Sequence, residues 1–184
     1  MGTGPEPRRR SGAIGENAVM TDTGGLMARI SGGLFQQAFV VDDLERAESA
    51  MRAALGCGEF VDLPATDLDY ELRGETVSCA LALGFARSGN MQIELLQPVR
   101  GRGLHAEFLA SNGPGAHHLG FLVDDRDEVQ AVGAAAGFPM VLSGAFGSLR
   151  FGYLDTFAEL GLYIEIVEDP DQMMIGLMPW RDDQ

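Results

Sequence analysis

The sequence contains no lysine, so all 13 of its basic residues are arginine. This absence excludes Schiff-base catalysis and the lysine of a phosphate-binding P-loop. No apolar run approaches the roughly 20 residues that a membrane-spanning helix needs. Positive charge is scarce too, because 27 acidic residues against 13 basic ones give a formal net charge of −14. Binders of nucleic acid or anionic membranes need cationic groups, so we expect neither partner.

Cysteine is nearly absent as well. Cys57 and Cys79 are the only two, and their spacing matches neither a zinc knuckle nor a redox pair, so we expect two free, reduced thiols. The N-terminal arginines at 8–10 are not followed by the apolar stretch of a secretory signal. Both observations favour a cytoplasmic location.

The residues that are present are typical of a globular protein, since 46% of the 184 residues are hydrophobic and 22% are charged. This length suits one domain, or two small modules that share a core. Residues 1–30 lack apolar periodicity, which predicts a flexible tail before a folded domain over 31–168. The C-terminal extension over 169–184 is rich in methionine and could cover a sheet edge or a subunit contact, or form a loose tail.

An internal repeat is the most informative feature. The run Phe35-Gln-Gln-Ala-Phe-Val-Val-Asp-Asp43 is matched 82 positions later by His117-His-Leu-Gly-Phe-Leu-Val-Asp-Asp125. Each run predicts a strand that passes into a helix, with the aspartates as N-caps. We expect these helices over residues 44–55 and 127–136, each followed by a glycine that ends it.

Each copy also closes with a similar strand, Met91-Gln-Ile-Glu-Leu-Leu96 in the first and Leu162-Tyr-Ile-Glu-Ile-Val167 in the second. The offset is now 71 residues, so the first copy carries about 11 extra residues, which we place at 66–76. The repeat predicts an α+β fold. Two tandem β-α-β-β-β modules, about 34–98 and 115–168, would form an eight-stranded incomplete barrel with external helices.

Four polar residues occupy repeat-related positions in these apolar strands. Gln36 is equivalent to His118 in the first strands, and Glu94 is equivalent to Glu165 in the last strands. A carboxylate in such a strand is costly to bury unless a cation pairs with it. One divalent metal ion would serve all four residues, and nearby arginines are the alternative. A register error of one residue would replace Gln36 by Gln37.

Other polar residues near these strands have two interpretations each. Tyr153 and Arg150 could contact a substrate oxygen or carboxylate, or could be structural. His117 alternates to the other face of its strand, which favours a supporting role. His105 lies in a polar connection, which predicts a solvated surface residue.

The repeated runs, together with Tyr153-Leu-Asp-Thr156 and Leu160-Gly161, resemble the vicinal oxygen chelate superfamily of glyoxalases, bleomycin-resistance proteins and extradiol dioxygenases. The resemblance spans roughly 34–168 and is closest to uncharacterised glyoxalase-like bacterial members. It implies a metal site formed by Gln36, Glu94, His118 and Glu165, for Zn, Ni or Co, with Fe or Mn as further options. This set is similar to that of eukaryotic glyoxalase I. Methylmalonyl-CoA epimerases usually carry His in the first site and Gln in the second.

The resemblance implies a metal-dependent isomerase or lyase of glyoxalase I-like or epimerase-like type. Such an enzyme transfers a proton next to a carbonyl of a substrate with vicinal oxygens, through a metal-stabilised enediolate. Glu165 is the first candidate for the base and Glu94 the second. A homodimer is expected. The alternatives are a non-catalytic binding or resistance protein and a ring-cleaving dioxygenase, which Gln36 disfavours because that site uses a second histidine.

Overall fold

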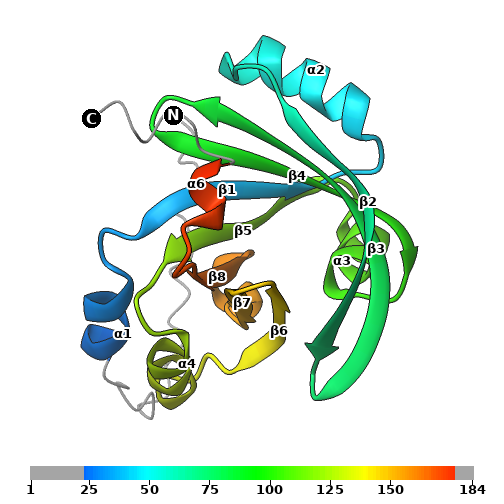
Figure 1. The fold of residues 1–184 in the computed structure, drawn as a ribbon. Coiled ribbons are helices and arrows are strands. Elements are labelled where there is room, and N and C mark those ends of the chain that lie inside the picture. The colour runs from blue at the N-terminus through cyan, green and yellow to red at the C-terminus, as the bar shows by residue number, and fades with distance from the viewer. Residues whose placement is uncertain (1–22, 177–184) are drawn as a thin grey trace, which may run out of the picture.

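The structure, a computed structural model, describes residues 23–176. Eight strands form one barrel, and α2 and α4 lie outside it (Figure 1). The elements in chain order are α1 (Thr23–Ile30), β1 (Leu34–Val40), α2 (Leu44–Leu55), β2 (Val61–Leu72), β3 (Glu75–Ser88), β4 (Met91–Gly101), α3 (Leu104–Asn112), β5 (Gly115–Leu122), α4 (Arg126–Ala135), β6 (Met140–Phe146), β7 (Leu149–Leu154), α5 (Phe157–Leu160), β8 (Tyr163–Glu168) and α6 (Met173–Gly176). Within these residues, no helix is long and apolar enough to cross a membrane.

The strand order around the barrel is β1-β4-β3-β2-β6-β7-β8-β5. Within each module the first strand runs parallel to the last, as β1 with β4 and β5 with β8. The modules meet where β1 pairs antiparallel with β5 and where β2 pairs antiparallel with β6. The predicted α+β fold of two β-α-β-β-β modules is therefore confirmed. It differs in one detail, since the barrel is closed and not incomplete.

The closure is made by the extra residues of module one. They lie in the β2–β3 hairpin, whose strands are 12 and 14 residues long, against 7 and 6 for β6 and β7. At its tip, Glu71 pairs with Ser143 and Leu72 with Leu142. The turn at Arg73 has positive φ, which suits a tight two-residue hairpin.

Both predicted helices begin directly after their aspartate caps, and α2 ends at the predicted glycine. Asp43 accepts a hydrogen bond from the Arg46 backbone N–H, and Asp125 accepts one from that of Glu128. Gly56 follows α2 in the left-handed region, at φ 62°. The second helix, α4, begins and ends one residue earlier than predicted.

The sequence did not predict α1 or α3. Leu26 and Ile30 of α1 are buried against α4, so the fold begins before Leu34, inside the expected tail. The sequence pattern did not predict α1, because the helix is short, contains two adjacent glycines and has only one apolar pair at i, i+4 spacing. The rest of that predicted tail, 1–22, and the end of the C-terminal extension, 177–184, lie outside the described residues. Cys57 and Cys79 are both free and buried.

Candidate metal centre

His118 lies at the centre of the four predicted ligands. Its Nε2 atom is 3.3 Å from Gln36 Oε1, 3.3 Å from Glu94 Oε2 and 3.3 Å from Glu165 Oε2. The exposed fractions of the four residues are 1% for Gln36 and His118 and 7% for the two glutamates. The structure therefore brings together one imidazole, two carboxylates and one amide from four strands.

The register of the parallel strands explains why the two glutamates meet. Ala38 lies opposite Glu94 in the β1–β4 pair, and Gly120 lies opposite Glu165 in the β5–β8 pair. Each of these small residues comes two positions after the first-strand ligand of its own module. Residues two positions apart in a strand lie on the same face of the sheet, because strand side chains alternate between faces. All four side chains therefore point to the inner face of the barrel.

Gln36 is held in place by two neighbours that the sequence did not indicate. Its Nε2 donates to Gln92 Oε1 at 2.6 Å, which leaves Gln36 Oε1 on the His118 side. Gln92 is 1% exposed. It precedes Glu94 by two residues, so the strand period places both on one face, and the sequence could have indicated Gln92 in this way. A Cβ atom at Gly120 would lie 2.8 Å from Gln36 Oε1, so this glycine makes room for the amide.

The charges in the centre do not balance by themselves. Burial opposes a charged imidazole, but the carboxylates of Glu165 and Glu94 outweigh it and raise the pKa of His118 to about 9. Burial raises the pKa of Glu94, while its hydrogen bond to His118 lowers it. One imidazolium can balance only one of two buried carboxylates. A divalent cation would balance both, and the donor atoms suit one.

Two further histidines lie beside the centre. His117 Nδ1 is 3.0 Å from His118 Nδ1, and His105 Nε2 is 3.3 Å from the Tyr153 hydroxyl. Burial lowers the pKa of His105 to about 3 and that of His117 well below its ordinary value, so both are neutral. His105, His117 and His118 could also hold a metal ion. That group has no carboxylate to balance a dication, so the glutamate-containing centre fits better.

These positions correct two expectations from the sequence. His105 was predicted on the surface, but α3 carries it inward and it is 2% exposed. His117 was predicted on the other face of its strand, but it is fully buried against the aromatic interior. A register shift opposite Ala38 and Phe39 makes His117 an extra residue in β5. Such a bulge breaks the two-residue alternation on which the prediction rested.

The two predicted substrate contacts lie in different places. Tyr153 is 2% exposed and lines the same cavity as Glu94 and Glu165. Burial, followed by these two carboxylates, raises its pKa well above 10, so its hydroxyl stays protonated and can donate to Glu165. Arg150 instead pairs with Asp127 and Glu168 away from the centre.

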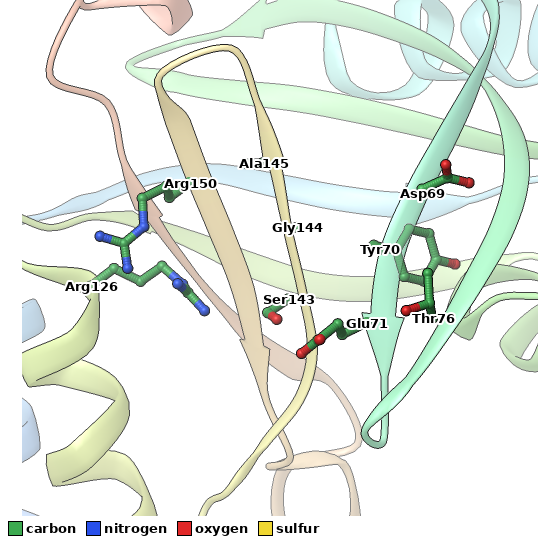
Figure 2. Close-up of a pocket in the computed structure, with 9 residues that line it drawn as sticks. All are labelled: Asp69, Tyr70, Glu71, Thr76, Arg126, Ser143, Gly144, Ala145 and Arg150. Atoms are coloured by element: carbon green, nitrogen blue, oxygen red, sulfur yellow. The ribbon is translucent and has the colours of Figure 1, made fainter.

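Arg150 lines a separate pocket of about 310 Å³. In Figure 2, Arg150 and Arg126 lie on one side of β6, and Glu71 lies on the other side. None of the four predicted ligands lines this pocket. The structure therefore does not bring Arg150 to the metal centre.

The metal centre opens into a cavity of about 400 Å³ inside the barrel. Gln36, Glu94 and Glu165 line it, together with many leucine and phenylalanine side chains. Leu63 and Phe146, also in the lining, are 37% and 56% exposed. The centre can therefore be reached by a small molecule through an apolar cavity.

A family model described as the Glyoxalase/Bleomycin resistance protein/Dioxygenase superfamily matches residues 35–153. Methylmalonyl-CoA epimerase from Mycobacterium tuberculosis is 21% identical with a TM-score of 0.54, over 80% of this chain and 94% of that chain. A hypothetical protein from Bacillus halodurans C-125 is 20% identical with a TM-score of 0.54, over 76% and 95%. A variant of Streptomyces coelicolor methylmalonyl-CoA epimerase in complex with 2-nitronate-propionyl-CoA is 22% identical with a TM-score of 0.51, over 74% and 96%. No curated protein gave a significant match.

Proposed function

Because the chain belongs to the glyoxalase/bleomycin resistance protein/dioxygenase superfamily, we propose that it is a metal-dependent enzyme that transfers a proton next to a carbonyl group. One divalent ion, with Zn, Ni or Co favoured, would be held by the four side chains around His118 Nε2. The observation that carries this proposal is the 3.3 Å distance from that nitrogen to an oxygen of each of the other three residues. Solved structures that share the fold include epimerases, which perform this class of reaction.

The residues of the chain suit a glyoxalase I-like lyase or an epimerase-like isomerase acting on a small molecule with vicinal oxygens. When bound, the metal would act as a Lewis acid on those oxygens and make the adjacent C–H bond more acidic. Glu165 Oε2 would accept the proton, with Glu94 Oε2 on the other module as the second acceptor. The protonated Tyr153 hydroxyl would orient Glu165, and the apolar wall would exclude water.

Metal content tests the first half of the proposal. Protein purified without chelators and loaded with Ni²⁺ or Zn²⁺ should hold about one ion per chain by elemental analysis. Glu94→Gln and Glu165→Gln should each weaken binding at least about tenfold. Glu48→Gln is the matched control, because Glu48 is also 7% exposed but lies on α2 beside Arg52. Absence of metal from the wild type, or equal affinities in all variants, would contradict the site.

Deuterium exchange tests the second half without knowledge of the product. Metal-loaded protein in D₂O should exchange the C–H next to the carbonyl of a substrate among α-hydroxy ketones and hemithioacetals, followed by NMR. Glu165→Gln should slow the exchange by about 10²- to 10⁴-fold. Stoichiometric metal without exchange on any compound would favour the non-catalytic binding or resistance protein. Oxygen consumption with Fe²⁺ and a catechol would instead indicate a ring-cleaving dioxygenase.

A further inference from the structure

The cavity beside the metal centre restricts the body of the substrate. Beyond the polar residues at its floor, its wall is made by Leu68, Leu81, Leu83, Phe85 and Phe151. Within residues 23–176, no arginine lines this cavity, and the sequence has no lysine. An anionic group on the body of the substrate would therefore lose its hydration against an apolar wall, with no arginine or lysine side chain to pair with it.

Seven of the nine arginines within residues 23–176 form ion pairs with carboxylates. These seven are Arg29, Arg46, Arg52, Arg73, Arg100, Arg126 and Arg150. Arg100, for example, pairs with Asp67, which is not among the residues that line the cavity. The formal net charge of −14 adds a general repulsion of anions. A phosphate-bearing carrier needs cationic or N–H donors, and the cavity does not offer cationic ones.

On these observations we propose that the substrate carries its vicinal oxygens on an uncharged, apolar body, such as an aryl or branched alkyl group. This proposal rests on the proposed function, because the metal would bind the oxygens. The volume of about 400 Å³ is near the lower end for cavities that bind small organic ligands. Exposed Leu63 and Phe146 would contact the apolar body at the cavity's outer part.

Three hydroxamic acids with the same chelating group test the substrate class. The 4-carboxy derivative of benzohydroxamic acid adds a charged group to the ring, and the 4-nitro derivative adds an uncharged group of the same size. The binding of all three to Ni²⁺-loaded protein is measured by calorimetry. We expect the two uncharged compounds to bind at least about tenfold more tightly than the 4-carboxy derivative. Phe146→Arg should bring the affinities of the 4-carboxy and 4-nitro derivatives closer together, because it places a cation beside the cavity at an exposed position.

The outcomes distinguish a wrong substrate class from a wrong metal site. Equal affinities of the 4-carboxy and 4-nitro derivatives, or tight binding of the carboxylate or of methylmalonyl-CoA, would overturn the substrate class and leave the metal site intact. Failure of all three hydroxamic acids to bind the metal-loaded protein would contradict the proposed function as well, because the shared chelating group would then find no accessible metal.

A second inference comes from the repeat and concerns His117. Its counterpart in module one is Phe35, and both stand at register shifts in the β1–β5 pair. Phe35 is buried in an apolar cluster with Leu149 and Val167. The fold therefore accepts an apolar residue at this position, and the imidazole of His117 requires a separate reason.

The reason lies in the difference between the two first-strand ligands. Gln36 is held by Gln92, whereas His118 has His117 Nδ1 at 3.0 Å from its own Nδ1. If His118 binds metal through Nε2, its Nδ1 must carry the proton and needs an acceptor. We infer that His117 is a positioning residue that fixes the tautomer and ring orientation of His118. His117 Nε2, a buried atom without a hydrogen-bond partner among the described residues, would then carry a proton, which is unfavourable for folding alone.

Two substitutions test this role. His117→Leu should lower metal affinity about 10- to 100-fold. His117→Asn should retain most of the affinity, because its amide oxygen can accept near the position of Nδ1. Nitrogen chemical shifts of the Zn²⁺-loaded wild type should show His118 protonated at Nδ1 and His117 protonated at Nε2, with His117 Nδ1 left to accept. Phe35→Leu, the control for repacking a bulge, should leave metal affinity unchanged.

Wild-type affinity in His117→Leu, or equal losses in the leucine and asparagine variants, would overturn the role of His117. So would nitrogen shifts that place the proton of His117 on its Nδ1, because that nitrogen could then not accept from His118. This last measurement uses only the wild type, so it decides even if a variant fails to fold.

Discussion

Modules one and two have the same strand order, but their hairpins differ in length and in their part in closing the barrel. Module one has the long β2–β3 hairpin, and only its tip residues pair with β6 to close the barrel. The corresponding hairpin of module two, β6–β7, has strands of 7 and 6 residues. The extra segment of module one thus closes the barrel through Glu71 and Leu72, and its Leu68 also lines the cavity beside the candidate metal centre.

The modules are also unequal in chemistry. Their last strands contribute the same residue with the same burial and the same distance to the imidazole, since Glu94 and Glu165 are both 7% exposed and both 3.3 Å from His118 Nε2. Their first strands contribute an amide from Gln36 and an imidazole from His118. The two modules therefore contribute equal charge to the candidate metal centre and differ in the uncharged donor, which is an amide in one and an imidazole in the other. Single substitutions can test each half of this comparison.

The largest expected effect separates the two glutamates. In the deuterium-exchange assay at saturating metal, Glu165→Gln should lower the rate by about 10²- to 10⁴-fold. Glu94→Gln should lower it less, because the Tyr153 hydroxyl forms a hydrogen bond with Glu165 and affects Glu94 only through charge. Equal losses would mean that the modules supply equivalent bases.

The next effect compares the first-strand ligands. His118→Gln gives module two the ligand of module one and should weaken metal binding at least about 100-fold, because an amide is the poorer donor. Gln36→His should strengthen binding about tenfold for the same reason. Competition with a chromophoric chelator measures both. Unchanged affinity in His118→Gln would remove the imidazole from the centre.

The repeat made the fold, and the meeting of these four side chains, predictable from the sequence. Equivalent positions in two copies must be equivalent in space, so Gln36 could be matched with His118, and Glu94 with Glu165, from the sequence alone. The closed barrel could not be predicted in this way. It depends on Leu72 meeting Leu142, a pairing between modules that has no counterpart in the repeat.

Residues that support the ligands were harder to predict, for physical reasons. His117 breaks strand alternation because a bulge changes which face a residue occupies. His105 depends on α3, which lies between the modules and has no repeated partner. For Arg150 the sequence left a substrate contact and a structural role open, and its side chain pairs with Asp127 and Glu168 and does not line the cavity.

A substitution at the hairpin tip tests whether module one closes the barrel. Arg73 has φ 52°, and its N–H donates to Val141 of β6 at 2.8 Å. Proline lacks this N–H and requires negative φ, so Arg73→Pro should lower the free energy of unfolding by about 2 kcal/mol, measured in urea. Arg73→Gly is the control, because it loses only an exposed ion pair with Glu107 and should change stability by less than about 1 kcal/mol. If Arg73→Pro were as stable as the wild type, the hydrogen bond from Arg73 to Val141 would not be needed to close the barrel.

The smallest expected effect concerns two small residues of the β1–β5 pair. Gly120 lies opposite Gln36, and Ala38 lies opposite His118. A Cβ at Gly120 would lie 2.8 Å from Gln36 Oε1, so Gly120→Ala should displace the amide and weaken metal binding about tenfold, with about 1 kcal/mol of lost stability. Ala38→Gly, at the equivalent position of module one, removes a Cβ beside His118 and should cost similar stability with little change in metal affinity. Calorimetry on both variants separates the two effects. If Gly120→Ala binds metal as the wild type does, Gln36 does not hold the ion, and the centre reduces to Glu94, His118 and Glu165.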